Sequence, residues 1–348
     1  MSLNPDITLH ELQQFPEGLL DVDASELHTM LSGPTLVHIA GERQPALFVS
    51  VLLHGNETTG WDAVRGLMSH YKNRQLPRAM SLFIGNIAAA SVQQRRLPGQ
   101  PDYNRVWPTL RNHGDTPEHR LVKQVFDIMQ KRNVFLSIDI HNNTGLNPHY
   151  ACINRLHNDF AHVARLFSKI VIYFTYPDGV QSHAFADICP AVTIECGQVG
   201  YQHGISHAQE YLDTCLHLEH IPTQVDPADE IVFYENFATI TIATGVSFCF
   251  EDAHDNTANS VDLVFFPELD RYNFTELALG TPIAQINSDH EEVLDVITND
   301  GENVFKDYFE IKRGMLVTRT QIIPSMLTAD VEIVRKDCLC YLMGRIMT

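Results

Sequence analysis

Two side chains that can bind a metal ion follow directly after an apolar run of the sequence. Residues 46–53 (ALFVSVLL) read as a buried strand, and His54-Gly55-Asn56-Glu57 comes next. Neutral imidazole and carboxylate suit zinc, and a catalytic zinc site needs a third protein ligand with one position left open. The tetrapeptide alone is equally compatible with a turn that carries a surface histidine and glutamate.

A third metal ligand is available at the end of another apolar run. Residues 134–140 (VFLSIDI) predict a strand, and His141 follows within the motif Asp139-Ile140-His141-Asn142. Carboxyl ends of parallel strands share one sheet edge, where open α/β sheets bind ligands. Asp139 could orient a metal-bound histidine or simply be buried near it. A polar cluster that caps the sheet is the alternative.

A glutamate closes a further apolar strand, in Thr193-Ile194-Glu195-Cys196-Gly197. Beside a metal-activated water, a carboxylate can accept a proton and later pass it to a leaving amine. A glutamate in a salt bridge at the sheet edge is the alternative for this residue in isolation.

Cations are concentrated in a loop rich in Pro and Gly that runs from Arg95 to Arg105. Arginine binds carboxylates through a bidentate fork and can stabilise a developing oxyanion, and Asn104 offers a neutral donor beside it. A solvated basic loop is the alternative. Loops of this length, here about residues 93–116, tend to be functional in compact domains.

The elements that must position these residues alternate between strand and helix, which is typical of the α/β class. After residue 229 the apolar segments become short and are separated by turn residues, which predicts an all-β region. We therefore predict domains over residues 1–224 and 225–348, with Pro222–Asp229 as the linker. The expected strands are 46–53, 80–86, 134–140, 170–175 and 191–195, and the expected helices 58–72, 117–132, 157–168 and 206–218. The expected β segments are 231–234, 237–243, 246–250, 261–266, 282–286, 293–297 and 315–323.

Charge excludes several classes of partner. The 348 residues carry 24 Lys and Arg against 43 Asp and Glu, for a formal net charge of −19. Nucleic acids and anionic membrane surfaces both require a basic footprint, so neither is expected as a partner. The first residues show no signal peptide, and seven cysteines without CxxC pairs indicate reduced thiols, so we expect a cytoplasmic protein.

The motifs taken in chain order resemble one family. HGNE is followed by Gly60, and Asn86 precedes an Arg-containing loop that ends in D-x-N-R. After this loop come the motif D-x-H-N and an apolar strand that ends in E-x-G. This combination resembles the succinylglutamate desuccinylase/aspartoacylase family of zinc-carboxypeptidase-like hydrolases, over roughly residues 35–205. The resemblance implies a mixed, largely parallel sheet flanked by helices, followed by a smaller all-β C-terminal domain. The C-terminal region matches the family's second domain in size and character only.

The resemblance also implies the catalytic roles. His54, Glu57 and His141 would ligate one Zn²⁺ per chain, and Glu195 would serve as general base and acid for a metal-activated water.

Substrate contacts follow from the same resemblance. Asn104 and Arg105 would hold the carboxylate of an amino acid, and Arg96 would polarise the scissile carbonyl, with Arg95 as the alternative. The step from Arg96 to Asn104 is one residue longer than the family usually shows. A tyrosine of the second domain also contributes in aspartoacylase, and Tyr308 is the candidate.

The sequence departs from aspartoacylase where a second arginine would grip a second carboxylate. No Lys or Arg occurs between Lys169 and Arg271, and His183 could instead contact something smaller or neutral. We therefore expect a zinc-dependent deacylase that cleaves the amide bond of a small N-acyl amino acid other than the namesake substrates. A metallocarboxypeptidase, an esterase on another small carboxylate, and a non-catalytic zinc-binding protein are the alternatives. Assembly into a homo-oligomer stays open.

Overall fold

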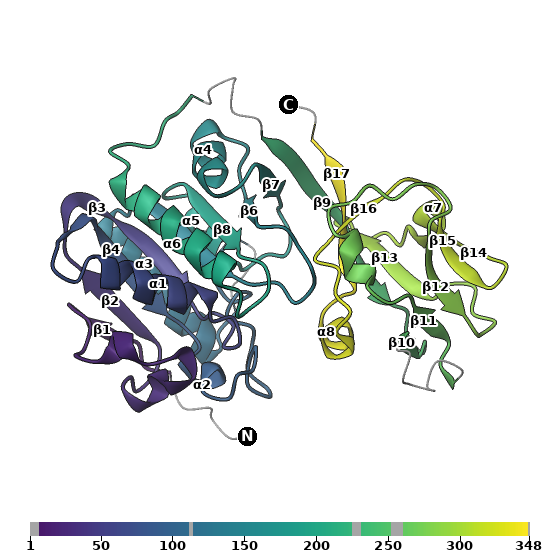
Figure 1. Ribbon diagram of the computed structural model, residues 1–348, viewed down its shortest axis with the longest axis horizontal. Coiled ribbons are helices and arrows are strands. Elements are labelled where there is room, and N and C mark those ends of the chain that lie inside the picture. Colours follow the sequence, from purple (N-terminus) through teal and green to yellow (C-terminus); the bar gives the residue numbers. More distant parts are fainter. Residues whose placement is uncertain (1–6, 111–113, 225–230, 252–259, 347–348) are drawn as a thin grey trace. The chain divides into compact units, whose positions relative to one another are not determined.

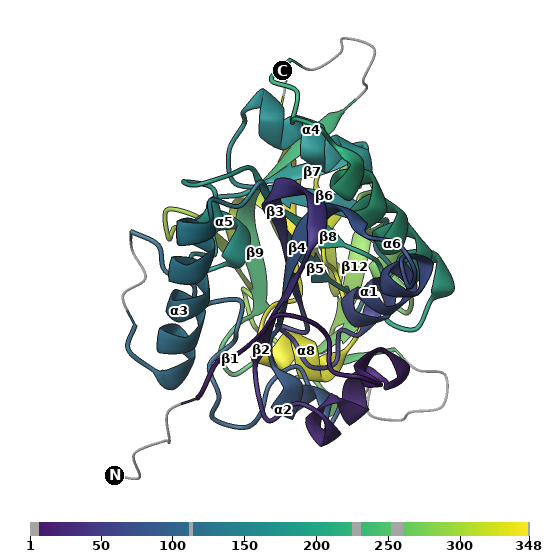
Figure 2. The same cartoon turned by 90° about the vertical axis from the view of Figure 1, so that its left-hand side faces the viewer.

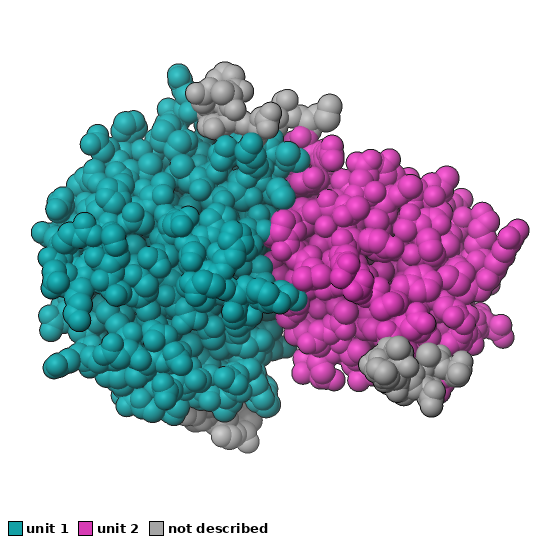
Figure 3. Space-filling view, viewed as in Figure 1, with its two compact units in different colours: residues 1–142, 149–232 teal, residues 143–148, 233–348 magenta. Residues whose placement is uncertain are grey.

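The computed structural model describes residues 7–110, 114–224, 231–251 and 260–346. These residues form two compact units, one of residues 1–142 and 149–232 and the other of residues 143–148 and 233–348 (Figure 3). Part of the predicted linker, from residue 225 on, lies outside the described residues.

A mixed, largely parallel sheet forms the centre of the first unit (Figure 1). Its strand order is β1-β2-β4-β3-β5-β8-β6-β7, and β3 pairs in parallel with both β4 and β5, as β5 does with β8. Two antiparallel pairs, β2 with β4 and β6 with β8, make the sheet mixed. The strands are β1 (His10–Leu12), β2 (Thr35–Ile39), β3 (Gly41–Val51), β4 (Leu76–Ile84), β5 (Leu136–His141), β6 (Tyr150–Ile153), β7 (Ile170–Tyr173) and β8 (Ala191–Glu195).

Helices cover both faces of this sheet (Figure 2). Helices α1 and α6 pack together on one face with α4 beside α6, and α3 and α5 lie on the other. The central strands are therefore buried on both sides, as their continuous apolar sequences predict. The helices are α1 (Thr59–His70), α2 (Ile87–Ala90), α3 (Pro117–Arg132), α4 (Asn158–Phe167), α5 (Gln181–Phe185) and α6 (Gln202–His217).

The second unit is rich in β structure and has its own apolar core, which includes Phe265, Leu294 and Leu316. One antiparallel group has the order β13-β9-β17-β16, and a five-stranded sheet has the order β10-β11-β12-β15-β14. The strands are β9 (Val232–Ile242), β10 (Phe248–Phe250), β11 (Leu263–Phe265), β12 (Pro282–Ile286), β13 (Leu294–Thr298), β14 (Phe309–Lys312), β15 (Met315–Thr318), β16 (Ile323–Ser325) and β17 (Cys340–Arg345).

The second unit differs from the prediction in detail. The predicted segments 231–234 and 237–243 form one strand, β9, and the predicted segment 315–323 contains both β15 and the start of β16. Two short helices, α7 (Phe305–Tyr308) and α8 (Val331–Lys336), interrupt the strands. The Asp330 carboxylate accepts hydrogen bonds from the backbone N–H groups of Glu332 and Ile333, which explains why α8 begins there. None of the helices in the described ranges is long and apolar enough to cross a bilayer.

Candidate metal centre

The loop between β3 and α1 brings His54 and Glu57 over the carboxyl edge of the sheet. Leu52 has a φ of 56°, a left-handed conformation that costs about 1–2 kcal/mol for a residue of this type and turns the chain out of β3. Gly55 then packs against the backbone of Ala89 and Ala90, and an added Cβ would lie 2.7 Å from the Ala89 side chain and closer still to that backbone. Only glycine fits at this position of the HGNE motif.

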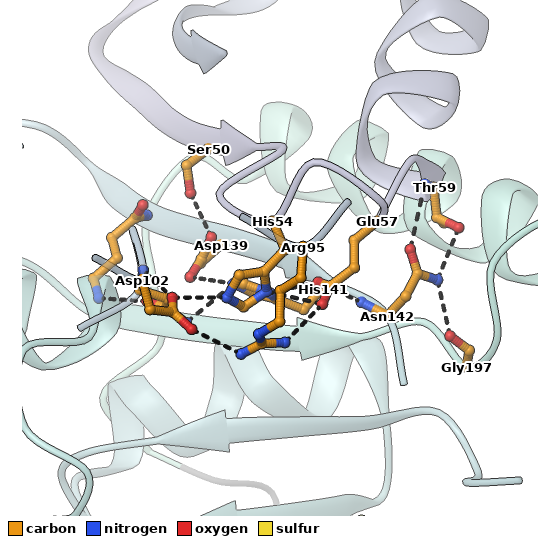
Figure 4. Close-up of polar contacts among 12 residues, drawn as sticks. Ser50, His54, Glu57, Thr59, Arg95, Asp102, Asp139, His141, Asn142 and Gly197 are labelled. Atoms are coloured by element: carbon orange, nitrogen blue, oxygen red, sulfur yellow. Dashed lines mark hydrogen bonds and ion pairs between the residues drawn. The ribbon is translucent and has the colours of Figure 1, made fainter. Parts of the chain in front are cut away.

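The three predicted ligands converge on one point (Figure 4). One ligand atom from each of His54, Glu57 and His141 lies within 4.8 Å of the others, and all three side chains are buried. The two Glu57 carboxylate oxygens, Oε1 and Oε2, each lie 2.8 Å from a histidine Nδ1, of His54 and His141 respectively. Burial acts to raise the pKa of Glu57, but the charges of the two histidines outweigh it and hold that pKa well below its usual range.

An aspartate contacts the far ring nitrogen, Nε2, of each histidine. His54 Nε2 lies 2.9 Å from Asp102 Oδ1, and His141 Nε2 lies 2.8 Å from Asp139 Oδ2. Histidines that bind metals almost always donate their other N–H to a carboxylate, carbonyl or water, which fixes the ring and its tautomer. The donor set of His54, Glu57 and His141, with these aspartates behind the two histidines, therefore fits a metal ion.

Hydrogen bonds from neighbouring strands hold the two aspartates and Glu57 in place. Ser50 Oγ on β3 donates to Asp139 Oδ1 at 2.6 Å, so the fully buried Asp139 is both paired and oriented. The backbone N–H of Asn142 donates to Glu57 Oε2 at 3.1 Å, and its side chain donates to Thr59 and to the Gly197 carbonyl. The ends of β5 and β8 are thus joined to the start of α1.

Glu195 lies at the end of β8, in register with His141 on β5. Burial raises its pKa to about 8, the charges of Glu57 and Asp139 add to this effect, and His141 opposes it. A carboxyl group with a raised pKa beside a metal site can exchange a proton near neutral pH, as a general base and acid must.

The arginine loop presents Arg95 to the centre, not Arg96. The Arg95 guanidinium lies 3.3 Å from Glu57 Oε1 and 3.0 Å from Asp102 Oδ2. Arg96 is exposed and donates to the carbonyl of Gln100 at 3.3 Å. Of the two arginines that the sequence offers, Arg95 is the one in contact with the cluster.

Asn104 and Arg105 follow in the same loop. Asn104 is buried, with its Nδ2 3.2 Å from His141 Nε2 and its Oδ1 accepting the backbone N–H of Gln181. Half-buried Arg105 donates a hydrogen bond to the Asn104 carbonyl at 2.7 Å. Burial is the largest influence on the pKa of Asp102 and acts to raise it. The charges of His54, Arg95 and Arg105 outweigh burial, and the pKa of Asp102 is lowered well below its usual range.

Two further predicted residues belong to other elements of the chain. His183 on α5 has its Nδ1 3.3 Å from Asp178 Oδ1. Tyr308 belongs to the second unit, where it ends α7 and its ring packs 5.4 Å from that of Phe237. Its proposed role in substrate binding stays a prediction.

Sequence reasoning missed Asp102 as a partner of the metal site. A hydrogen bond from the backbone N–H of Asn104 to Asp102 Oδ1, at 2.7 Å, explains the position of this aspartate. The D-x-N-R motif held the signal, because an aspartate can accept a hydrogen bond from the backbone N–H two residues after it.

Comparison with known proteins agrees with this geometry. A model of the succinylglutamate desuccinylase/aspartoacylase catalytic domain matches residues 43–218. The chain belongs to this family. The matched range contains the three candidate ligands and the loop from Arg95 to Arg105, and the family is one of hydrolases. A search of curated proteins found no match.

Solved structures show the same fold. Murine aminoacylase 3 is 16% identical with a TM-score of 0.59, covering 88% of this chain and 97% of that one. Succinylglutamate desuccinylase from Chromobacterium violaceum is 17% identical with a TM-score of 0.51, covering 81% and 88%. A succinylglutamate desuccinylase/aspartoacylase from Rhodobacter sphaeroides is 13% identical with a TM-score of 0.56, covering 89% of each chain.

Proposed function

We propose that this protein is a zinc-dependent hydrolase that removes the acyl group from a small N-acyl amino acid. The observation that carries the proposal is the buried His54–Glu57–His141 cluster, in which each histidine turns Nδ1 to Glu57 and Nε2 to an aspartate. Residues 1–224 would be the catalytic domain and residues 225–348 an accessory β domain. The cytoplasmic location inferred from the cysteine content is part of the same proposal.

The chain's own residues supply proton transfer and substrate contacts. Zinc, when bound, lowers the pKa of a water molecule and polarises a carbonyl group. Glu195 accepts the proton of the attacking water and returns it to the nitrogen of the departing amine. Its raised pKa of about 8 suits both halves of this exchange.

Substrate binding is assigned to the arginine loop. Asn104 and Arg105 would hold the carboxylate of the amino acid, through a neutral donor and a bidentate fork. Arg95, next to Glu57, would stabilise the oxyanion that develops on the amide carbonyl, with Arg96 as the residue that the family resemblance first suggested. Tyr308 would add a contact from the accessory domain.

The substrate is proposed to carry a single carboxylate. A second carboxylate would need a cation from the segment before Glu195, where aspartoacylase has its second arginine, and no Lys or Arg occurs between Lys169 and Arg271. Asp178, which lies beside His183 and accepts a hydrogen bond from Thr109, adds negative charge to this region.

The test compares wild type with Glu195→Gln on a panel of N-acyl amino acids, with zinc content measured in both proteins. We expect wild type to hydrolyse single-carboxylate substrates faster than N-acetylaspartate, and the variant to lose about 10²- to 10⁴-fold in kcat while retaining zinc. A kcat near that of wild type in the variant would overturn the mechanism.

The same panel separates the alternatives. A metallocarboxypeptidase would hydrolyse a tripeptide with the same C-terminal residue faster than the N-acyl amino acid. An esterase would hydrolyse the matching ester faster. Full zinc occupancy without hydrolysis of any of these compounds would indicate a non-catalytic zinc-binding protein.

A further inference from the structure

A buried glutamine that the sequence did not single out contacts the loop assigned to substrate binding. Gln181 is the first residue of α5, and its side chain is completely buried. Its Nε2 donates to Ser137 Oγ at 3.1 Å and to the Ile138 carbonyl at 3.4 Å, both on β5. A carbonyl oxygen only accepts hydrogen bonds, so this contact fixes which way the Gln181 carboxamide lies. The start of α5 is thereby attached to the strand that ends in His141.

The segment that leads into α5, residues 178–181, pairs with residues 104–109 of the loop that carries Asn104. Three hydrogen bonds join them: from the Gln181 N–H to Asn104 Oδ1 (3.2 Å), from the Trp107 N–H to the Gly179 carbonyl (2.9 Å) and from Thr109 Oγ1 to Asp178 Oδ2 (2.7 Å). Because Gln181 is attached to β5, the loop that pairs with its segment is attached to the same strand.

The contact with Gln181 decides which end of the Asn104 carboxamide faces the candidate metal centre. A backbone N–H can only donate, so Oδ1 lies toward Gln181, and Nδ2 lies 3.2 Å from His141 Nε2. His141 Nε2 donates its own proton to Asp139 Oδ2, at 2.8 Å. Asn104 Nδ2 can therefore direct its N–H groups to a carboxylate ligand, whereas the opposite orientation would present an oxygen that repels one.

We propose that Gln181 is a positioning residue for substrate binding. Its hydrogen bonds to β5 and to Asn104 keep the Asn104 nitrogen turned toward the carboxylate of the amino acid. The inference rests on the proposed function, because that function assigns Asn104 to this carboxylate. The contact is the same in the bound substrate and in the transition state, so its loss should weaken binding and spare the chemical step.

The test replaces Gln181 by Met, which has a similar length and cannot donate these hydrogen bonds. KM for the preferred N-acyl amino acid should rise by about 10-fold, which corresponds to one hydrogen bond to a charged group. The variant should retain its zinc, and kcat should stay within about 2-fold of wild type. A fall in kcat with KM unchanged would overturn the role of Gln181.

Two further variants keep the test decisive if Gln181→Met folds poorly, which circular dichroism checks. Ser137→Ala removes one acceptor of Gln181 Nε2 and should raise KM by a smaller factor. Ser182→Ala is the matched control, because Ser182 is the next residue of α5, equally buried, and accepts a hydrogen bond from Thr193 on β8. Its KM should equal that of wild type, and a rise as large as that of Gln181→Met would contradict the proposal.

Binding is also measured without turnover, by calorimetry with the same N-acyl amino acid in the Glu195→Gln background. Adding Gln181→Met should raise Kd by about 10-fold. This loss of affinity together with no hydrolysis by wild type would count against the proposed function alone. An unchanged Kd would overturn the role of Gln181 alone, and no binding by the Glu195→Gln protein would overturn both.

Discussion

Each histidine of the candidate metal centre has both ring nitrogens occupied by carboxylates. For His54 the outer partner is Asp102, which also contacts Arg95 and the backbone of Asn104. Asp102 thus links a candidate metal ligand to the loop that is proposed to bind substrate. It acts through His54 and is a positioning residue.

Replacing Asp102 by Asn tests this role. The variant keeps the size of the side chain but removes the charge that orients the His54 ring, so zinc affinity should fall by roughly 10- to 100-fold. Competition with a chelator of known affinity measures the change. Arg96→Ala, on the exposed side of the same loop, is the control and should bind zinc as wild type does. Unchanged affinity in Asp102→Asn would show that this contact does not support the metal.

The two neighbouring arginines should differ in their effect on turnover. Arg95→Ala removes the guanidinium that lies 3.3 Å from Glu57, and kcat/KM should fall by about 10²- to 10³-fold, as for the loss of an oxyanion donor. Arg96→Ala should leave kcat/KM close to that of wild type, because Arg96 is exposed. Steady-state kinetics on one N-acyl amino acid compares them, and the opposite order would return the role to Arg96.

At the scale of elements, the centre depends on how closely α1 packs on the strand ends. Gly60, in the first turn of α1, leaves no room for a side chain. An added Cβ would lie 2.9 Å from Val51 Cγ1 and 3.1 Å from Ile140 Cβ. Glu57 lies two residues before the start of α1, so a displacement of α1 would also displace this candidate metal ligand.

Gly60→Ala should therefore destabilise the protein by about 1–3 kcal/mol, the usual cost of overpacking. Gly66→Ala on the same helix is the matched control. There the added Cβ meets only the end of the Gln209 side chain, which can move away, and alanine favours the helix by about 1 kcal/mol. Urea unfolding of the metal-free proteins measures both changes. Equal stability of the two variants would contradict the packing argument.

The sequence predicted the long elements better than the short ones. Helix α3 has the predicted bounds 117–132, because Thr116 caps it and Pro117 occupies its first turn. Strand β8 also matches at 191–195. Strand β6 and helix α5, of four and five residues, are too short to show a period, and neither was predicted.

The ligand types and their places at strand ends could likewise be read from the sequence, since a parallel sheet brings those ends together. The choice between Arg95 and Arg96 could not. These residues are adjacent in a loop without periodicity, and their directions depend on tertiary contacts such as the hydrogen bond from Gly55 N–H to the Arg95 carbonyl. The Asp102–His54 contact joins residues 48 apart and has the same origin.

At the scale of the whole molecule, the net negative charge of the protein disfavours the approach of the proposed anionic substrate. A net charge of −19 repels an anionic N-acyl amino acid at long range. Residues 221–348 contribute 8 Lys and Arg against 22 Asp and Glu, so most of the surplus lies outside the family's catalytic region. Binding must then depend on the local cations of the arginine loop and on the metal ion.

Zinc removal is the most direct test of the central claim, that His54, Glu57 and His141 hold a catalytic zinc ion. A chelator-stripped preparation is assayed on a single-carboxylate N-acyl amino acid before and after one equivalent of Zn²⁺ is returned. We predict that stripping abolishes hydrolysis, that zinc restores it in wild type, and that it does not in His141→Ala. Full hydrolysis by the stripped protein, or restoration in His141→Ala, would contradict the account.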